Sequence, residues 1–319
     1  MLAIVCPGQG AQKPGFLSPW RELPGVEAML ASLSEAAGVD LLRHGTESDA
    51  DTIRDTAIAQ PLLVAAGIIA GTQLGPQDDG PDLPPADVIA GHSVGELTAA
   101  ALAHVLSDED AMRLVAVRSQ AMAKAAAAEP TGMAAVVGGA RDEVLAAIER
   151  HGLHAANINS AAQVVAAGST DALAALAEDA PSRARVIPLP VAGAFHTPYM
   201  AGARDELAGF VPTLSVADPS SPLISNAGGE SVSTGSRYLE LIVTQVASPV
   251  DWEACMGALR ERGVTGMVEL SPAGTLTGLA KRDVKGVATV NLNTPDDLEA
   301  ARDLVHEHAG VAASEGQEH

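Results

Sequence analysis

The sequence predicts an α/β fold in which a small domain is inserted into a larger one. Short apolar strands alternate with helical segments along most of the 319 residues. A G-x-S-x-G string at 91–95 lies between one such strand and the helix that follows it. The segment between Gly132 and Pro190 has a strand and helix order of its own. The first observation predicts the fold class, the second the chemistry and the third the inserted domain.

The N-terminal part begins with an apolar run at 2–6, which predicts a buried strand. In the following loop, 7–12, two glycines surround Gln9, so the backbone there can pass close to a ligand. A polar turn at the end of a strand is the simpler alternative. Further along, the sequence predicts helices at 26–37 and 56–70 and a surface loop rich in Gly and Pro at 75–85.

The G-x-S-x-G string is Gly91-His92-Ser93-Val94-Gly95. The apolar run 87–90 predicts a strand before it, and the Ala/Leu-rich run 96–103 predicts a helix after it. This context predicts a nucleophile elbow, in which a sharp turn lifts the Ser93 hydroxyl clear of the sheet. Because the helix begins at the serine, its free N–H groups face any negative charge that forms there. A glycine-bracketed turn that merely contains a serine is the alternative.

The next predicted helix starts at Ser107, which acidic residues follow, and runs to Lys124. Arg118 lies on the same helical stripe as apolar residues such as Leu114 and Met122. A guanidinium on an inward face is costly unless an anion meets it. The anion is either a ligand or a buried carboxylate of the protein, and the helix alone leaves both open.

The inserted segment predicts strands at 133–137, 155–159, 163–167 and 185–189 and helices at 141–150 and 171–178. This βαββαβ order over about 60 residues is typical of a ferredoxin-like domain. We therefore predict a small domain at 126–191, a discontinuous large domain at 1–125 and 192–310, and a disordered tail at 311–319.

After the insertion, His196 lies at the return to the large domain, close to Pro198. A lone histidine is usually structural, but Ser93 needs a base, and most other histidines lie in helices, at termini or beside the serine. Further strands are predicted at 222–226, 266–270 and 287–291, and a loop at 271–274 leads into a helix at 275–281.

The composition limits the kinds of partner and compartment. Hydrophobic residues make up 47% and aromatic residues 2%, so the core must consist of Ala, Val and Leu. The net charge of −21 argues against nucleic acid and anionic membrane surfaces. No apolar run near 18 residues and no basic, apolar leader is evident, which predicts a soluble, cytoplasmic protein. The cysteines, Cys6 and Cys255, have no metal-ligand spacing and suit a reducing compartment.

Eight motifs together resemble one enzyme family. They are P-G-Q-G-A-Q at 7–12, A-Q-P at 59–61, G-H-S-V-G-E at 91–96, R-S-Q-A-M at 118–122, N-I-N-S at 157–160 with Q-V-V-A-A-G at 163–168, A-F-H-T-P-Y-M at 194–200, T-Q-V-A-S-P-V-D-W at 244–252 and S-P-A-G-T-L-T-G-L-A-K-R at 271–282. In this order they resemble the malonyl-CoA:acyl-carrier-protein transacylases of fatty-acid and polyketide synthesis and the acyltransferase domains of modular synthases. The chain departs from the family pattern at Cys6, Ala161-Ala162 and Ser271, none of which is a predicted catalytic position.

The resemblance implies an α/β-hydrolase-like large domain with an inserted ferredoxin-like small domain. It implies Ser93 as nucleophile and His196 as base, with the histidine oriented by a carbonyl in the neighbourhood of Gln245 rather than by a carboxylate. The backbone N–H groups of Gln9 and Val94 would form the oxyanion hole. Arg118 would bind the malonyl carboxylate. The remaining substrate-binding residues that the resemblance implies are Gln60, His92, Asn157, Asn159 and Phe195.

The implied reaction moves malonyl from malonyl-CoA to the phosphopantetheine thiol of an acyl carrier protein through a Ser93 ester. It needs no metal or other cofactor, and family members are commonly monomers. Val94 and the G-A-F-H string at 193–196 resemble the malonyl-selecting pattern. A serine thioesterase, in which water resolves the ester, is the alternative; a carrier-protein-binding module without catalysis would be expected to lack Ser93 or His196.

Docking of a carrier protein raises a question of charge. Carrier proteins are generally acidic, and the net charge of this chain would repel them. We therefore expect a local basic patch at Lys281, Arg282 and Lys285, faced by Arg183 and Arg185 of the small domain. Ordinary solvated surface is the alternative for these residues.

Overall fold

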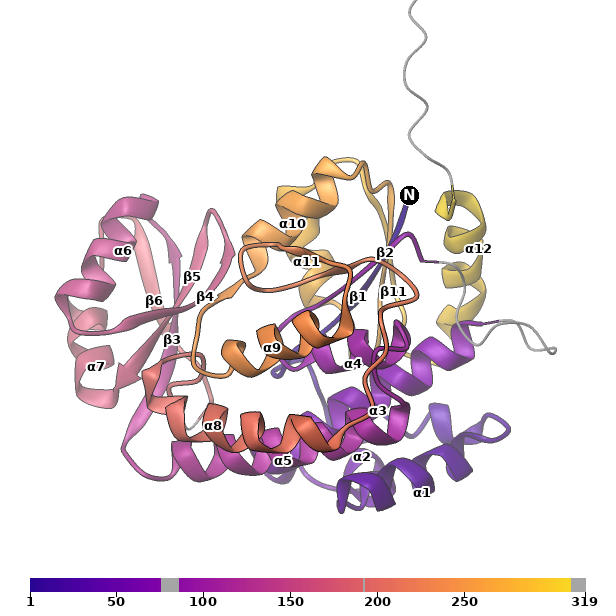
Figure 1. The fold of residues 1–319 in the computed structure, drawn as a ribbon. Coiled ribbons are helices and arrows are strands. Elements are labelled where there is room, and N and C mark those ends of the chain that lie inside the picture. The colour runs from indigo at the N-terminus through magenta and orange to yellow at the C-terminus, as the bar shows by residue number, and fades with distance from the viewer. Residues whose placement is uncertain (76–85, 192, 311–319) are drawn as a thin grey trace, which may run out of the picture.

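The computed structural model describes residues 1–75, 86–191 and 193–310. The predicted surface loop, from residue 76 on, and the predicted tail at 311–319 lie outside the described residues. The described residues form two β-sheets that lie side by side, with helices around them (Figure 1).

The larger sheet has the strand order β11-β10-β1-β2-β7-β8. Its strands are β1 (Leu2–Cys6), β2 (Val88–Gly91), β7 (Leu223–Ile224), β8 (Ser231–Val232), β10 (Gly266–Glu269) and β11 (Ala288–Asn291). All neighbouring strands are parallel except β7 and β8. The carboxyl ends of β1, β2 and β10 therefore meet at one edge of the sheet, where ligands of open α/β sheets bind.

Both faces of this sheet are covered. In β1, Leu2, Ile4 and Cys6 belong to one apolar core, and Ala3 and Val5 to another. The first core includes side chains of α1 (Val26–Ala37), α3 (Thr56–Leu74), α4 (Gly95–Leu102), α5 (Asp108–Ala126), α8 (Ala201–Phe210), α9 (Gly235–Gln245) and α12 (Leu298–His308). The second includes α10 (Trp252–Glu261) and α11 (Thr275–Asp283). Because parallel strands are buried on both faces, the whole of β1 is apolar rather than alternating.

The smaller sheet has the order β6-β3-β5-β4-β9. Its elements are β3 (Thr131–Gly138), α6 (Arg141–Arg150), β4 (His154–Ser160), β5 (Gln163–Ser169), α7 (Thr170–Glu178), β6 (Ala184–Pro188) and β9 (Val250–Asp251). The four predicted strands and two predicted helices are confirmed. The fifth strand, β9, pairs in parallel with β4 and corrects the predicted count. A two-residue strand has no periodicity from which to predict it.

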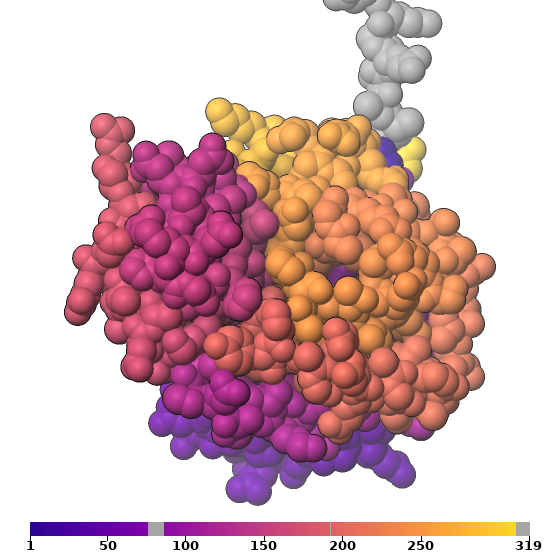
Figure 2. Space-filling model, turned by 60° about the vertical axis from the view of Figure 1, so that its left-hand side comes forward, coloured from indigo at the N-terminus to yellow at the C-terminus, as the bar shows by residue number. Residues whose placement is uncertain are grey.

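One face of the smaller sheet packs against α6 and α7, and the other face turns toward the larger sheet. An ion pair between Arg141 of α6 and Glu253 of α10 joins the two parts. Figure 2 shows the magenta surface of the small-sheet segment against the orange surface of the C-terminal segment.

The short remaining helices are α2 (Leu41–Thr46) and the 3₁₀ turns Trp20–Glu22, Thr52–Arg54, Pro198–Met200, Val211–Thr213 and Pro295–Asp297.

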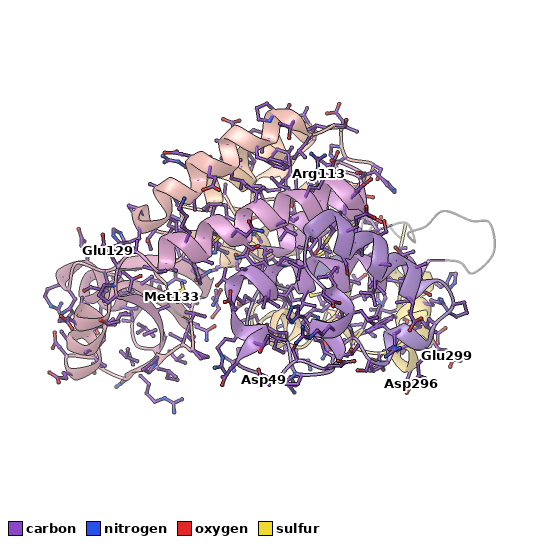
Figure 3. All side chains as sticks on the ribbon, turned by 90° about the horizontal axis from the view of Figure 1, so that it is seen from below. Asp49, Arg113, Glu129, Met133, Asp296 and Glu299 are labelled. Carbon is purple, nitrogen blue, oxygen red and sulfur yellow. The ribbon has the colours of Figure 1, made fainter. Side chains whose placement is uncertain are left out.

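Helix α3 extends four residues beyond the predicted end at Ala70. Its length and composition show that the prediction of no apolar run near 18 residues was wrong. By length and composition it alone among the described helices could cross a membrane, with a mean hydropathy of 1.6. In the fold, however, 78% of that window is buried inside the protein. A Cβ at Gly67 would lie 2.5 Å from Thr98 of α4, so the two helices pack in close contact. Helix α3 is therefore a core helix, and the long helix α5, which carries Arg113, packs against it (Figure 3).

Candidate active site

The predicted strand, turn and helix around Ser93 are confirmed. Strand β2 ends at Gly91, α4 begins at Gly95, and Ser93 between them has a φ of 54°, which few residues with a side chain adopt. A Cβ at Gly91 would lie 2.1 Å from the carbonyl carbon of Gly95. A Cβ at Gly95 would lie 2.2 Å from the carbonyl oxygen of Cys6. Close backbone approach therefore requires glycine at both positions, and the turn projects Ser93 from the sheet.

The structure brings His196 to Ser93. The Nε2 atom of His196 lies 2.7 Å from Ser93 Oγ, and its Nδ1 lies 2.8 Å from the backbone carbonyl oxygen of Gln245. Burial, together with the nearby Arg118 charge, lowers the pKa of His196 to about 3, so the imidazole is neutral near pH 7. A neutral ring has one N–H. Since the carbonyl can only accept, that N–H is on Nδ1, and Nε2 accepts from the Ser93 hydroxyl.

Arg118 is buried beside the serine, with 1% of its surface exposed. Its Nη1 donates to Gln60 Oε1 at 2.6 Å, and its Nη2 donates to Gln245 Oε1 at 2.9 Å and to Ser93 Oγ at 3.4 Å. Its Nε is buried without a hydrogen-bond partner. In the described part of the chain, no carboxylate lies within salt-bridge distance of this guanidinium. Neutral amide oxygens hold the cation, so a direct internal ion pair does not explain its position.

Two polar residues behind the serine complete a network that the sequence analysis missed. The Asn226 side chain accepts from the Ser93 backbone N–H at 2.8 Å and donates to the Gly91 carbonyl at 2.7 Å. Glu96 of α4 is fully buried and accepts from the Asn226 backbone N–H at 2.7 Å. Gln245 Nε2 donates to Glu96 Oε2 at 2.5 Å. Asn226 and Glu96 are polar residues next to apolar segments of the sequence. This contrast is the signal that could have identified them.

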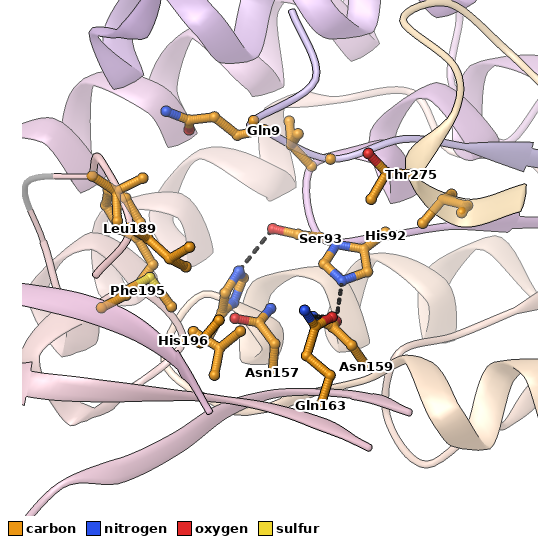
Figure 4. A pocket seen from close by; sticks show the side chains of 18 of the residues that line it. Gln9, His92, Ser93, Asn157, Asn159, Gln163, Leu189, Phe195, His196 and Thr275 are labelled. Atoms are coloured by element: carbon orange, nitrogen blue, oxygen red, sulfur yellow. Dashed lines mark hydrogen bonds between the residues drawn. The ribbon is translucent and has the colours of Figure 1, made fainter. Parts of the chain in front are cut away.

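A cavity of about 280 Å³ lies in front of Ser93, between the two sheets (Figure 4). Nine predicted site residues line it: Gln9, Gln60, His92, Ser93, Val94, Asn157, Asn159, Phe195 and His196. Gln163 of β5 and Thr275 of α11 also line it and were not predicted. Arg118 and Gln245 are not among the lining residues and contact Ser93 from behind the cavity wall.

His92 connects the elbow to the smaller sheet. Its Nε2 lies 2.9 Å from Asn159 Oδ1, and Asn159 Nδ2 donates to Gln163 Oε1 at 3.2 Å (Figure 4). On its other side, the His92 ring packs on Trp252, with 5.6 Å between ring centroids. Burial lowers the pKa of His92. His92 and Asn159, which come from two distant motifs, thus form one continuous wall of the cavity.

The loop at 7–12 lies tightly against the elbow, because a Cβ at Gly8 would lie 2.9 Å from the His92 carbonyl oxygen. The Gln9 side chain does not point to Ser93 but donates to the Arg54 carbonyl at 3.2 Å. Val94 is the N-cap residue of α4. Gln9 and Val94 both line the cavity. Any contribution they make to an anion site therefore comes from their backbone N–H groups rather than from their side chains.

The structure shows where the residues of the predicted basic patch lie, and their use as a docking surface stays a prediction. Helix α11 lines the cavity with its first turns and ends near Lys281 and Arg282, which are exposed and form no salt bridge in the described chain. Arg183 and Arg185 do not face them. They lie at β6, the outer edge of the smaller sheet, whereas α11 contacts β4 near the opposite edge. The predicted pairing of the two groups is therefore wrong, because strand order places them on different sides.

Metal binding has no candidate here: across the described ranges, no group of three or more His, Cys, Asp or Glu residues could hold a metal ion. Cys6 and Cys255 are buried free thiols, and burial raises the pKa of each.

Comparisons with known proteins agree with this geometry. The family model described as the acyl transferase domain matches residues 4–295. The chain is 46% identical over 306 residues to the malonyl CoA-acyl carrier protein transacylase of Mycobacterium bovis, with 95% of this chain and all of that protein covered. The crystal structure of MCAT from Mycobacterium tuberculosis superimposes with a TM-score of 0.89 at 45% identity and covers 95% of this chain and 99% of its own. A complex of a type II PKS acyl-carrier protein with its malonyl-transacylase, PlMCAT:AntF, gives a TM-score of 0.88 at 28% identity. The match covers 95% of this chain and 99% of that chain.

Proposed function

This chain belongs to the acyl transferase family as a malonyl-CoA:acyl-carrier-protein transacylase, and we propose that it works through a malonyl ester on Ser93. The observation that carries the proposal is Arg118. A buried guanidinium reaches to 3.4 Å from the nucleophile oxygen, and neutral acceptors hold it. Its charge is therefore available to a substrate that brings its own carboxylate. A plain fatty acyl thioester would give this residue nothing to bind.

The first half-reaction follows from the Ser93–His196 contact. As Ser93 Oγ attacks the thioester carbonyl of malonyl-CoA, His196 Nε2 takes the hydroxyl proton. The backbone N–H groups of Gln9 and Val94 stabilise the oxyanion, and one such donor contributes about 3 kcal/mol. When the tetrahedral intermediate collapses, the carbon–sulfur bond breaks, and His196 returns the proton to the CoA sulfur. The products are the Ser93 ester and free CoA.

The second half-reaction repeats these steps with another thiol. His196 takes the proton of the phosphopantetheine thiol, the sulfur attacks the Ser93 ester, and the proton returns to Ser93 Oγ as the ester bond breaks. His196 must be neutral to accept a proton in both steps, and its low pKa keeps it so. The Gln245 carbonyl holds its Nδ1–H, which is the role that a carboxylate has in many serine hydrolases.

Arg118 would bind the malonyl carboxylate at the far end of the acyl group. A carboxylate accepts from a guanidinium more strongly than an amide oxygen does, so it can replace Gln60 or use the free Nε–H. Of the other predicted substrate-binding residues, His92, Asn157, Asn159 and Phe195 line the path of the thioester, and Gln60 acts beside Arg118.

The finer domain description is also a proposal. The strand order β6-β3-β5-β4, with α6 and α7 on one face, supports a ferredoxin-like small domain at 126–191. The elbow between β2 and α4 supports an α/β-hydrolase-like large domain at 1–125 and 192–310. We further propose a cytoplasmic monomer that supplies fatty-acid or polyketide synthesis without binding nucleic acid or membranes. Lys281, Arg282 and Lys285 would receive the acidic carrier protein.

Mass spectrometry of the intact protein tests the proposal. The protein mixed with malonyl-CoA should gain one malonyl group, and Ser93→Ala should gain none. Adding carrier protein with its phosphopantetheine arm should remove the group from the enzyme and place it on the carrier. Release of free malonate without carrier protein, at the rate of loading, would instead indicate a hydrolase.

A further inference from the structure

Glu96 is a fully buried carboxylate to which the steps above assign no part. An unpaired buried charge is costly, and no cation in the described residues lies within salt-bridge distance of it. Its place in the first turn of α4 offsets part of that cost through the helix dipole. Hydrogen bonds from the Ser225 side chain, from the Asn226 backbone N–H and from Gln245 Nε2 offset more. The last two donors belong to residues that contact the Ser93 turn.

Gln245 lies between Glu96 and Arg118, with its Nε2 on the carboxylate and its Oε1 on the guanidinium. A side-chain amide has a donor end and an acceptor end, and it can be reversed without changing its shape. Here only one orientation is possible, because an ionised carboxylate only accepts and a guanidinium only donates. Gln245 Nε2 also donates to the Ser93 carbonyl at 3.1 Å and to Asn226 Oδ1 at 3.0 Å, so Glu96 is the charged one of three acceptors that keep the Oε1 end of Gln245 toward Arg118.

We propose that Glu96 is a positioning residue for the malonyl carboxylate: it fixes the Gln245 amide so that Arg118 is held beside Ser93 and still carries an unneutralised charge. This inference rests on the proposed function of Arg118. Gln245 acts as a spacer, since direct contact between Glu96 and Arg118 would occupy the cation with an internal carboxylate. Glu96 itself touches no substrate.

Glu269 provides a matched comparison. It is also fully buried, but its carboxylate accepts from the backbone N–H groups of Leu276 and Thr277 and from the Thr277 hydroxyl. It thus caps the start of α11, and in the described part of the chain it forms no hydrogen bond with Arg118 or Gln245. Glu96→Gln and Glu269→Gln make the same chemical change at equal burial, and only the first alters the network around the guanidinium.

The test measures kcat/KM for loading of Ser93 by malonyl-CoA and by acetyl-CoA, and takes the ratio. In Glu96→Gln the new amide N–H₂ must face either the Asn226 N–H or Gln245 Nε2, so one donor meets another unless Gln245 reverses. We expect the malonyl-to-acetyl ratio to fall on the order of tenfold or more. In an Arg118→Ala background, Glu96→Gln should leave the ratio unchanged within about twofold. Glu269→Gln should lower the melting temperature and leave the ratio at the parent value.

A second measurement needs no variant and covers the case in which Glu96→Gln does not fold. Burial raises the pKa of Glu96 to about 7, so its protonation creates a donor at the same place as the amide of Glu96→Gln. The parent ratio should fall as the pH is lowered from 8 to 6. The groups that face Glu96 from α5, α9 and α10 are Arg118, Tyr238 and Cys255, and each titrates above this range.

Equal losses for malonyl and acetyl loading in Glu96→Gln, as for Glu269→Gln, would overturn the proposal and leave Glu96 a structural residue. A parent ratio that stays constant from pH 8 to 6 would overturn it as well. Failure of the parent protein to form any malonyl ester on Ser93 is a different result, because it refutes the proposed function before the ratio can be measured.

Discussion

The two walls of the cleft differ in how firmly their polar groups are held. On the larger-sheet side, His196, Arg118 and Gln245 are 4%, 1% and 5% exposed, and each has at least two hydrogen-bond partners. On the smaller-sheet side, the Asn159 and Gln163 side chains remain partly exposed, and among the described residues they form hydrogen bonds only with each other and with His92. The groups that we propose to act on the acyl chain are thus held in place by the protein itself, which is what electrostatic preorganisation requires. The opposite wall keeps adaptable groups for contact with a long substrate.

The strongest test of this comparison removes the nucleophile. Ser93→Ala should lower malonyl transfer to the carrier protein at least about 10³-fold, because the ester can no longer form. A radioactive or mass-based transfer assay with purified protein measures this. Transfer at near the parent rate would contradict the ester mechanism, whereas unchanged melting temperature would confirm that the fold is intact.

Removing the cation on the same side should have the next largest effect. Arg118→Ala should lower malonyl loading about 10²-fold or more and acetyl loading much less, because only malonyl brings a carboxylate. Arg113→Ala is the matched control on the same helix, since Arg113 pairs at the surface with Asp110 and packs on Phe210. Equal losses for both substrates would mean that Arg118 is structural.

On the smaller-sheet side, Asn159→Ala should act mainly on binding. We expect KM for malonyl-CoA to rise about tenfold and kcat to change less than about threefold, since no reacting group loses a contact. Steady-state kinetics over a range of malonyl-CoA concentrations separates the two constants. A fall in kcat as large as that of Arg118→Ala would show that the two walls do not differ in this way.

Outside the cleft, the basic end of α11 should affect only the protein partner. Reversing Lys281 and Arg282 to Glu should raise KM for the carrier protein about three- to tenfold at low salt and leave loading from CoA nearly unchanged. Reversing Arg183 and Arg185 makes the same charge change at the far edge of the smaller sheet and is the control. Equal effects of the two reversals would indicate the net field rather than a docking patch.

The smallest effect concerns pH. A histidine with an ordinary pKa near 6.5 would lose about tenfold of its neutral form, and of the activity that depends on it, between pH 8 and 5.5. Because the pKa of His196 is lowered, its neutral form persists well below pH 5.5, and acetyl loading should change less than about twofold from pH 8 to 5.5. A tenfold drop through pH 6.5 in stopped-flow loading experiments would show that substrate or solvent reaches the imidazole more than the fold suggests.

Local patterns predicted much of the fold. Helix α6 has the predicted bounds, 141–150, because an amphipathic run between breakers determines a helix by itself. Helices α8, α9, α10 and α12 and strand β9 were not predicted. The two residues of β9 become a strand only because β4, about 90 positions earlier in the chain, offers a free edge. Their pairing is a property of the assembled sheet.

The candidate site divides in the same way. The sequence by itself determined the elbow, since two glycines, a strand and a helix adjacent in the chain force the Ser93 turn. It also determined that Arg118 would face inward. Which anion that guanidinium serves was decided only by tertiary structure, because Gln245, 127 residues away, is placed between it and Glu96. In the sequence Glu96 is one more acid in the first turn of a helix, like Glu109. Its charge affects the hydrogen bonds around Arg118 only because distant segments of the chain bury it.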